Sequence, residues 1–61
     1  MKLTAREQEV VQLVVQGKGN QAIAGALGIT PNTVKMYLDK IYRKLGVPNR
    51  TGLAVWAAKR K

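Results

Sequence analysis

The sequence predicts an all-α fold of four helices in a single domain that spans residues 1–61. Two observations support this prediction. Apolar residues recur at helical spacing along the chain, and residues that favour helix starts and stops flank the periodic segments. A chain this short buries only roughly 60% of its unfolded surface. We therefore expect its stability to come from helix packing and from a partner subunit.

The first helix is expected to begin after Thr4. The sequence Thr4-Ala5-Arg6-Glu7 is a capping box, in which Thr4 and Glu7 each satisfy a backbone N–H of the other. Val10, Leu13 and Val14 follow as an apolar stripe at helical spacing. The segment is rich in β-branched residues, which also suit a strand. Its capping box and its polar glutamines, spaced four residues apart, favour a helix. The glycines of segment 17–19 end it.

The second helix is expected over about Asn20–Leu27 and the third over Pro31–Leu45. Gly28 supplies the backbone freedom that ends one helix. Thr30 can cap the next helix, and Pro31 occupies its first position, where a missing N–H costs nothing. The third helix repeats apolar residues along one face at Val34, Leu38, Ile41 and Leu45.

A short helix, a glycine-containing turn and a basic second helix together indicate a helix-turn-helix. This motif places its second helix in the major groove of DNA. The third helix, about 31–45, is therefore predicted to be the recognition helix.

The fourth helix is expected over about Arg50–Lys59, with Asn49 as its cap and Gly46 ending the helix before it. One side is predicted to pack on the core through Leu53, Ala54 and Ala57. The other side is predicted to form a two-fold dimer through Thr51, Gly52, Val55 and Lys59. A glycine on that side would allow two helices to approach closely, although a lone exposed valine is also common on protein surfaces.

Charge and composition indicate the partner. Eleven Lys and Arg residues against three acids give a net charge of +8, which predicts a polyanion as the partner. The chain has no cysteine and no histidine, so we expect no disulfide, no metal site and no cofactor. No nucleophile–base pair is available, so we expect no enzyme activity. No apolar run could span a bilayer and no signal peptide is evident, which predicts a cytoplasmic protein without a membrane partner.

The helical repeat predicts which side chains of the third helix face DNA. The candidates for reading bases are Asn32, Lys35, Met36 and Asp39. Lys35 can donate to guanine, and Met36 can contact a thymine methyl group. Asp39 has two possible roles: it can accept from cytosine N4, or it can pair within the helix with Lys35 or Arg43.

Phosphate contacts form a separate class, which positions the protein without specifying sequence. The candidates are Asn20, Gln21, Thr33, Lys40, Arg43, Lys44 and Arg50. For any one of these cations, a solvated surface charge is an equally good interpretation. Tyr37 and Tyr42 are predicted to pack against the core rather than to stack on bases.

Four motifs along the chain resemble the LuxR-type (GerE-type) helix-turn-helix domain of bacterial transcription regulators. They are Leu3-Thr4-x-Arg6-Glu7-x-Glu9-Val10, Gly17-x-x-Asn20-x-x-Ile23-Ala24-x-x-Leu27-x-Ile29, Thr33-Val34-Lys35 and Lys44-Leu45-x-Val47-x-Asn49-Arg50. The resemblance implies a third helix that reads DNA, a fourth helix that pairs two domains, and a place at the bacterial nucleoid. RNA polymerase is a further possible partner.

The sequence departs from the family pattern at several positions. A serine is usual where this chain has Gly19, Lys-Glu is favoured at Gln21-Ala22, and a glutamate often stands at the position of Gly52. Tyr37 and Asp39 stand where histidine and asparagine are frequent. The change at Asp39 bears most on function because it puts the base preference in doubt.

Two other functions compete with sequence-specific regulation. A sigma-factor domain that reads promoters shares the Leu-Thr-x-Arg-Glu start, but the exit from the third helix and a full fourth helix argue against it. Alternatively, the chain could be a protein-interaction module that dimerises with a larger regulator and titrates it. Co-purification with a longer homologue, without DNA affinity of its own, would identify such a module.

Overall fold

The computed structural model describes residues 3–59; the ends of the predicted domain, 1–2 and 60–61, lie outside the described residues. Within this range the chain forms four helices and no strand. They are α1 (Ala5–Val15), α2 (Asn20–Leu27), α3 (Pro31–Leu45) and α4 (Arg50–Ala58). The predicted all-α class and all four helices are confirmed, with α4 ending one residue before Lys59.

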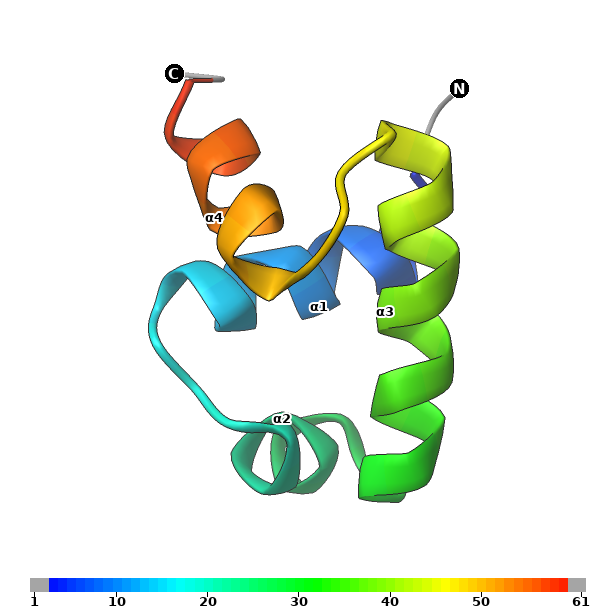
Figure 1. Ribbon diagram of the computed structural model, residues 1–61. Coiled ribbons are helices and arrows are strands. Elements are labelled where there is room, and N and C mark those ends of the chain that lie inside the picture. Colours follow the sequence, from blue (N-terminus) through cyan, green and yellow to red (C-terminus); the bar gives the residue numbers. More distant parts are fainter. Residues whose placement is uncertain (1–2, 60–61) are drawn as a thin grey trace.

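The helices pack around α1, which contacts each of the other three. The long helix α3 forms one side of the molecule, and α2 lies across its N-terminal end (Figure 1). Helix α4 packs on α1 and α3 at the opposite end from α2 (Figure 1). The arrangement leaves one full side of α3 facing outward.

Three of the four helix starts are capped by side chains, as predicted. Thr4 Oγ1 accepts from the Glu7 N–H at 3.2 Å, and Glu7 Oε1 accepts from the Thr4 N–H at 2.8 Å, which completes the capping box. Thr30 and Asn49 each accept from the N–H three residues later. Helix α2 follows Gly19 and has no side-chain cap.

The predicted helix stops are also confirmed. Gly28 follows α2 with a φ of 70°, and Gly46 follows α3 with a φ of 68°. Both angles are in the left-handed region that residues with a Cβ rarely adopt. These glycines therefore end each helix within one residue and set the turn into the next element.

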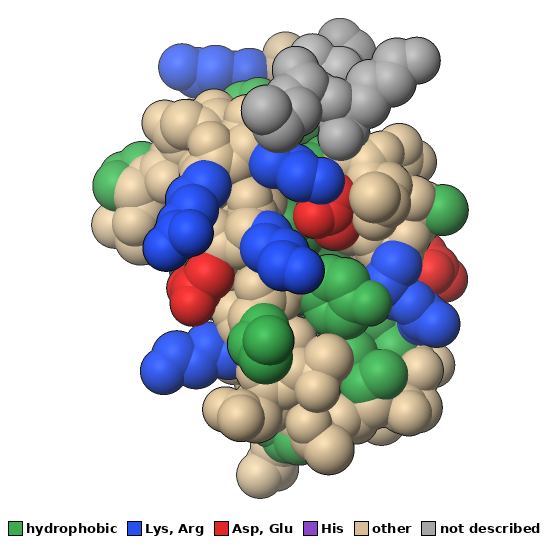
Figure 2. Space-filling view, turned by 90° about the vertical axis from the view of Figure 1, so that its right-hand side faces the viewer, with side chains coloured by type: hydrophobic (Ala, Val, Ile, Leu, Met, Phe, Trp, Pro, Cys, Tyr) green, Lys and Arg blue, Asp and Glu red, His purple; other side chains and the backbone are tan. Residues whose placement is uncertain are grey.

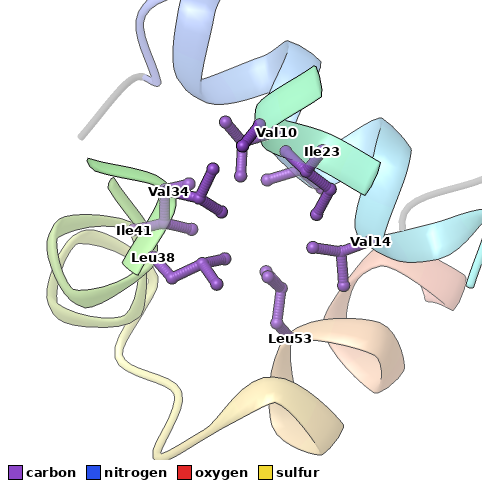
Figure 3. Packing of buried hydrophobic residues seen from close by; sticks show 9 residues of the cluster. Val10, Val14, Ile23, Val34, Leu38, Ile41 and Leu53 are labelled. Atoms are coloured by element: carbon purple, nitrogen blue, oxygen red, sulfur yellow. The ribbon is translucent and has the colours of Figure 1, made fainter. Parts of the chain in front are cut away.

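One apolar core joins the four helices. Seven of its side chains converge on a common centre, with contributions from every helix (Figure 3). The buried apolar residues are Val10, Val11, Val14, Ile23, Ala24, Val34, Leu38, Ile41 and Leu53. Tyr37, Tyr42 and Trp56 are half-buried and pack against this core. The prediction that both tyrosines pack on the core is confirmed.

The structure corrects one expectation for α4 and adds a constraint at Gly52. Ala54 is exposed, whereas Leu53 and Ala57 pack on the core as predicted. A Cβ on Gly52 would lie 2.8 Å from Pro48 Cδ and 3.4 Å from Val47 Cβ. The glycine is therefore required by the chain's own loop before α4. Close approach of a second helix at this glycine stays a prediction.

Candidate nucleic-acid interface

The outward side of α3 is a continuous polar and basic surface. Val34, Leu38 and Ile41 are buried on the inner side of this helix. The outward side chains, here called the α3 outer face, are Asn32, Lys35, Met36, Asp39, Lys40 and Arg43, all exposed. Figure 2 looks onto this side of the molecule and shows Lys and Arg side chains spread over it, with acidic side chains between them. The structure thus brings all four predicted base-reading residues together on one exposed surface.

The charges of the α3 outer face form no ion pair with another residue of the described range 3–59. The described residues contain two ion pairs, Arg6–Glu9 at 3.9 Å and Lys44–Glu7 at 2.7 Å, and neither involves this face. Asp39 therefore makes no ion pair with Lys35 or Arg43, and the intrahelical pairing considered for it is not formed. Among the described residues, Met36 is the most exposed large apolar residue, at 58%, and it lies between these charges.

Lys44 has a role other than the one predicted. Its ammonium donates to Glu7 Oε1 at 2.7 Å, and the Glu7 side chain is buried. The hydrogen bond from Lys44 and that from the Thr4 backbone N–H lower the pKa of Glu7, against the opposing effect of its burial. The Lys44 charge thereby neutralises a buried carboxylate within the fold. This ion pair weighs against the predicted phosphate contact at Lys44.

Arg50 is also directed into the molecule. Its Nη1 donates to Asn20 Oδ1 at 2.9 Å, and its Nη2 donates to the carbonyl oxygen of Lys18. These hydrogen bonds connect the first residue of α4 to the first residue of α2 and to the loop before it. This use of two donors within the fold weighs against the predicted phosphate contact at Arg50.

Sequence reasoning missed both of these tertiary contacts. One signal was available for the first: Glu7 lies three and seven residues before Val10 and Val14, on the side of α1 that faces the core. A carboxylate at such a position needs a cationic partner. For Arg50 no comparable signal exists, because its acceptors are an amide and a backbone carbonyl.

The start of α2 is a helix N-terminus without a side-chain cap. No acidic residue occupies its first turn, and Gln21 is exposed. The first N–H groups of a helix have no intrahelical partner, and the helix dipole makes this end positive. Asn20 is half-buried and accepts a hydrogen bond from Arg50, and Thr33, in the first turn of α3, places its hydroxyl 2.9 Å from that of Thr30.

The proposed dimer side of α4 is partly open to solvent. Thr51, Val55 and Lys59 are exposed, with Val55 at 48%, whereas Gly52 is half-buried beside Pro48. Over residues 3–59 no group of three or more acidic, His or Cys side chains is placed to hold a metal ion. In the same range, each helix is too short or too polar to cross a membrane.

Comparison with known proteins finds similarity along almost the whole chain. A family model described as bacterial regulatory proteins, luxR family, matches residues 1–57. The two-component response regulator PprB of Pseudomonas aeruginosa is 48% identical over 54 residues, which cover 88% of this chain and 20% of PprB. The nitrate/nitrite response regulator protein NarL of Escherichia coli is 38% identical over 55 residues, covering 90% and 26%. The chain thus spans about a quarter or less of the length of these relatives.

Proposed function

The chain belongs to the luxR family of bacterial regulatory proteins, which act in DNA-binding transcription regulation, and we propose that it reads a specific duplex sequence with α3 in the major groove. The observation that carries this proposal is the α3 outer face. It presents three cations, one amide, one carboxylate and one thioether on a single exposed helix side with no internal ion pair. This family is one of DNA-binding regulators and not a class of enzymes.

In this arrangement four side chains read base edges. Lys35 donates to guanine O6 or N7, and Met36 contacts a thymine methyl group. Asn32, in the first turn of α3, bridges an adenine in this proposal. Asp39 accepts from cytosine N4, a role that its lack of an internal ion pair supports.

Phosphate contacts come from the two edges of this surface. Lys40 and Arg43 flank the base-reading residues on α3. The uncapped start of α2 supplies backbone N–H groups at Asn20 and Gln21, and Thr33 contributes its hydroxyl from the first turn of α3. Lys44 and Arg50 are not included because both are engaged within the fold.

We further propose that two copies bind a palindromic or nearly palindromic site through α4. Thr51, Val55 and Lys59 are the exposed residues of that contact. Such a dimer would be weak alone and promoted by DNA, because the two half-sites hold the copies together. A regulator of this kind works at the bacterial nucleoid in the cytoplasm.

The experiment that tests this function is selection from a pool of random duplex DNA, followed by a salt titration on the recovered sequence. We expect a palindromic motif and a log–log salt slope of about −0.9 per neutralised phosphate. Lys35→Ala should weaken binding by about 1–3 kcal/mol and relax the motif at one position. Arg6→Ala, which removes a cation from α1, is the matched control and should leave the motif unchanged.

Two outcomes would count against the proposal. Binding with strong salt dependence but no recovered motif would identify a non-specific basic binder. A strict monomer, both free and on the selected duplex, would exclude the dimer through α4.

A further inference from the structure

Arg50 provides a hydrogen-bonded connection between α4 and the start of α2. Helix α2 packs on α1 and α3, and within the described residues it has no close backbone approach to α4. The Arg50 guanidinium bridges this separation with two hydrogen bonds, one to the Asn20 amide oxygen and one to the Lys18 carbonyl. Both acceptors are at least 30 residues away in sequence.

The guanidinium determines the geometry of this bridge and which atom of Asn20 takes part in it. Its donors are fixed in a planar fork, so two hydrogen bonds to two elements fix their relative placement. Because a guanidinium can only donate, it must face the oxygen of the Asn20 amide. The NH₂ group of Asn20 is thereby left as the donor for another partner. Arg50 also holds the loop that precedes the uncapped start of α2.

We propose that Arg50 is a positioning residue for DNA binding. It fixes the start of α2 relative to α4 and thereby orients the Asn20 side chain, but it does not touch DNA itself. This inference rests on the proposed function, in which the start of α2 meets the phosphate backbone and α4 pairs two copies. Through Arg50, the α4 surface that pairs two copies is held in a fixed position relative to the surface that contacts DNA.

The discriminating substitution is Arg50→Lys, which keeps the charge but loses the planar fork. We expect Arg50→Lys and Arg50→Ala to weaken binding of a mixed-sequence duplex by a similar factor, roughly fivefold. The slope of log affinity against log salt should stay at the wild-type value, because no phosphate contact is removed. Backbone amide signals of residues 20–22 should shift in the NMR spectrum of Arg50→Lys, with the helical content unchanged.

Arg43 is the matched control, since it is an exposed arginine of α3 with no ion pair in the described structure. Arg43→Lys should retain most of the affinity, and Arg43→Ala should lower the salt slope by about one phosphate contact. Affinities are measured by fluorescence anisotropy, well below the melting temperature of each variant. Any loss of affinity is then a property of the folded protein and not a result of unfolding.

Each other outcome has a definite reading. If Arg50→Lys binds like wild type while Arg50→Ala loses about one unit of salt slope, Arg50 contacts phosphate directly and the proposal is overturned. If both variants melt earlier but bind with wild-type affinity when folded, Arg50 serves stability alone and the proposal is overturned. Failure of the wild-type chain to bind the duplex would instead reject the proposed function.

Discussion

Replacing Lys44 by methionine tests how much the fold depends on one ion pair. Lys44 Nζ lies 2.7 Å from Glu7 Oε1, and the two side chains are 25% and 4% exposed. The same Glu7 oxygen accepts the Thr4 backbone N–H at 2.8 Å as part of the α1 capping box. Lys44→Met keeps the aliphatic stem and removes the charge, so the carboxylate is left buried without a cation.

The expected loss follows from this burial. Removing one partner of a fully buried ion pair costs about 3–5 kcal/mol, whereas exposed pairs contribute about 0–1 kcal/mol. Because a quarter of the Lys44 side chain is exposed, we expect an intermediate loss of about 2 kcal/mol at pH 7. A domain of 61 residues is typically stable by about 3–9 kcal/mol. The melting temperature should therefore fall by about 8–16 °C.

Thermal and urea unfolding, followed by circular dichroism, measure this loss. Lys40→Met is the matched control, because Lys40 lies on the same helix, is exposed and makes no ion pair in the described structure. The double variant Glu7→Gln/Lys44→Met removes both charges and should recover to within about 1 kcal/mol of wild type. Its glutamine can still accept the Thr4 N–H.

The effect should also depend on pH in a defined direction. The pKa of Glu7 is lowered in the folded state by Lys44 and by the Thr4 N–H. The stabilisation is therefore complete above the unfolded pKa of about 4.3 and is lost as the pH falls through the lowered folded value. The difference between wild type and Lys44→Met should shrink below about pH 4. If Lys44→Met costs no more than Lys40→Met, or its cost is the same in acid, the reasoning is refuted.

Four further substitutions test other parts of the molecule. In thermal melts, Gly52→Ala should destabilise the domain by about 1–3 kcal/mol, because its Cβ would meet Pro48 Cδ at 2.8 Å. Gly25→Ala is the control: a Cβ there lies in open space on α2, so the substitution should stabilise the domain by up to about 1 kcal/mol. Asp39→Asn should tighten binding to any duplex and change the selected motif at one base pair, and an unchanged motif would show that Asp39 does not read cytosine. Val55→Glu should weaken pairing through α4, so cooperativity on the selected duplex that equals wild type would locate the dimer contact elsewhere.

The helices could be predicted because their signals are local. Thr30 and Asn49 accept hydrogen bonds from N–H groups three residues away, and Gly28 and Gly46 act through their own φ angles. The helical repeat of α3 likewise depends on that helix alone. It correctly separated the buried side from the exposed side that carries the predicted base-reading residues.

The roles of Lys44 and Arg50 could not be predicted in this way. Their partners lie 37 and at least 30 residues away, so the contacts exist only after α1 and α2 have been placed in three dimensions. Before packing is known, a lysine on the flank of a basic helix is indistinguishable from one that meets phosphate. Gly52 shows the same limit, because its neighbours Pro48 and Val47 are set by the path of a loop.

The alternation of buried and outward positions along α3 has a consequence for how such a domain can change over time. No outer-face residue belongs to the buried core, and none takes part in the two ion pairs of residues 3–59. A library randomised at Lys35, Met36 and Asp39 should therefore yield mostly folded proteins with differing DNA preferences. Under the proposed function, single substitutions at these positions should change the preferred DNA sequence while the melting temperature stays nearly constant.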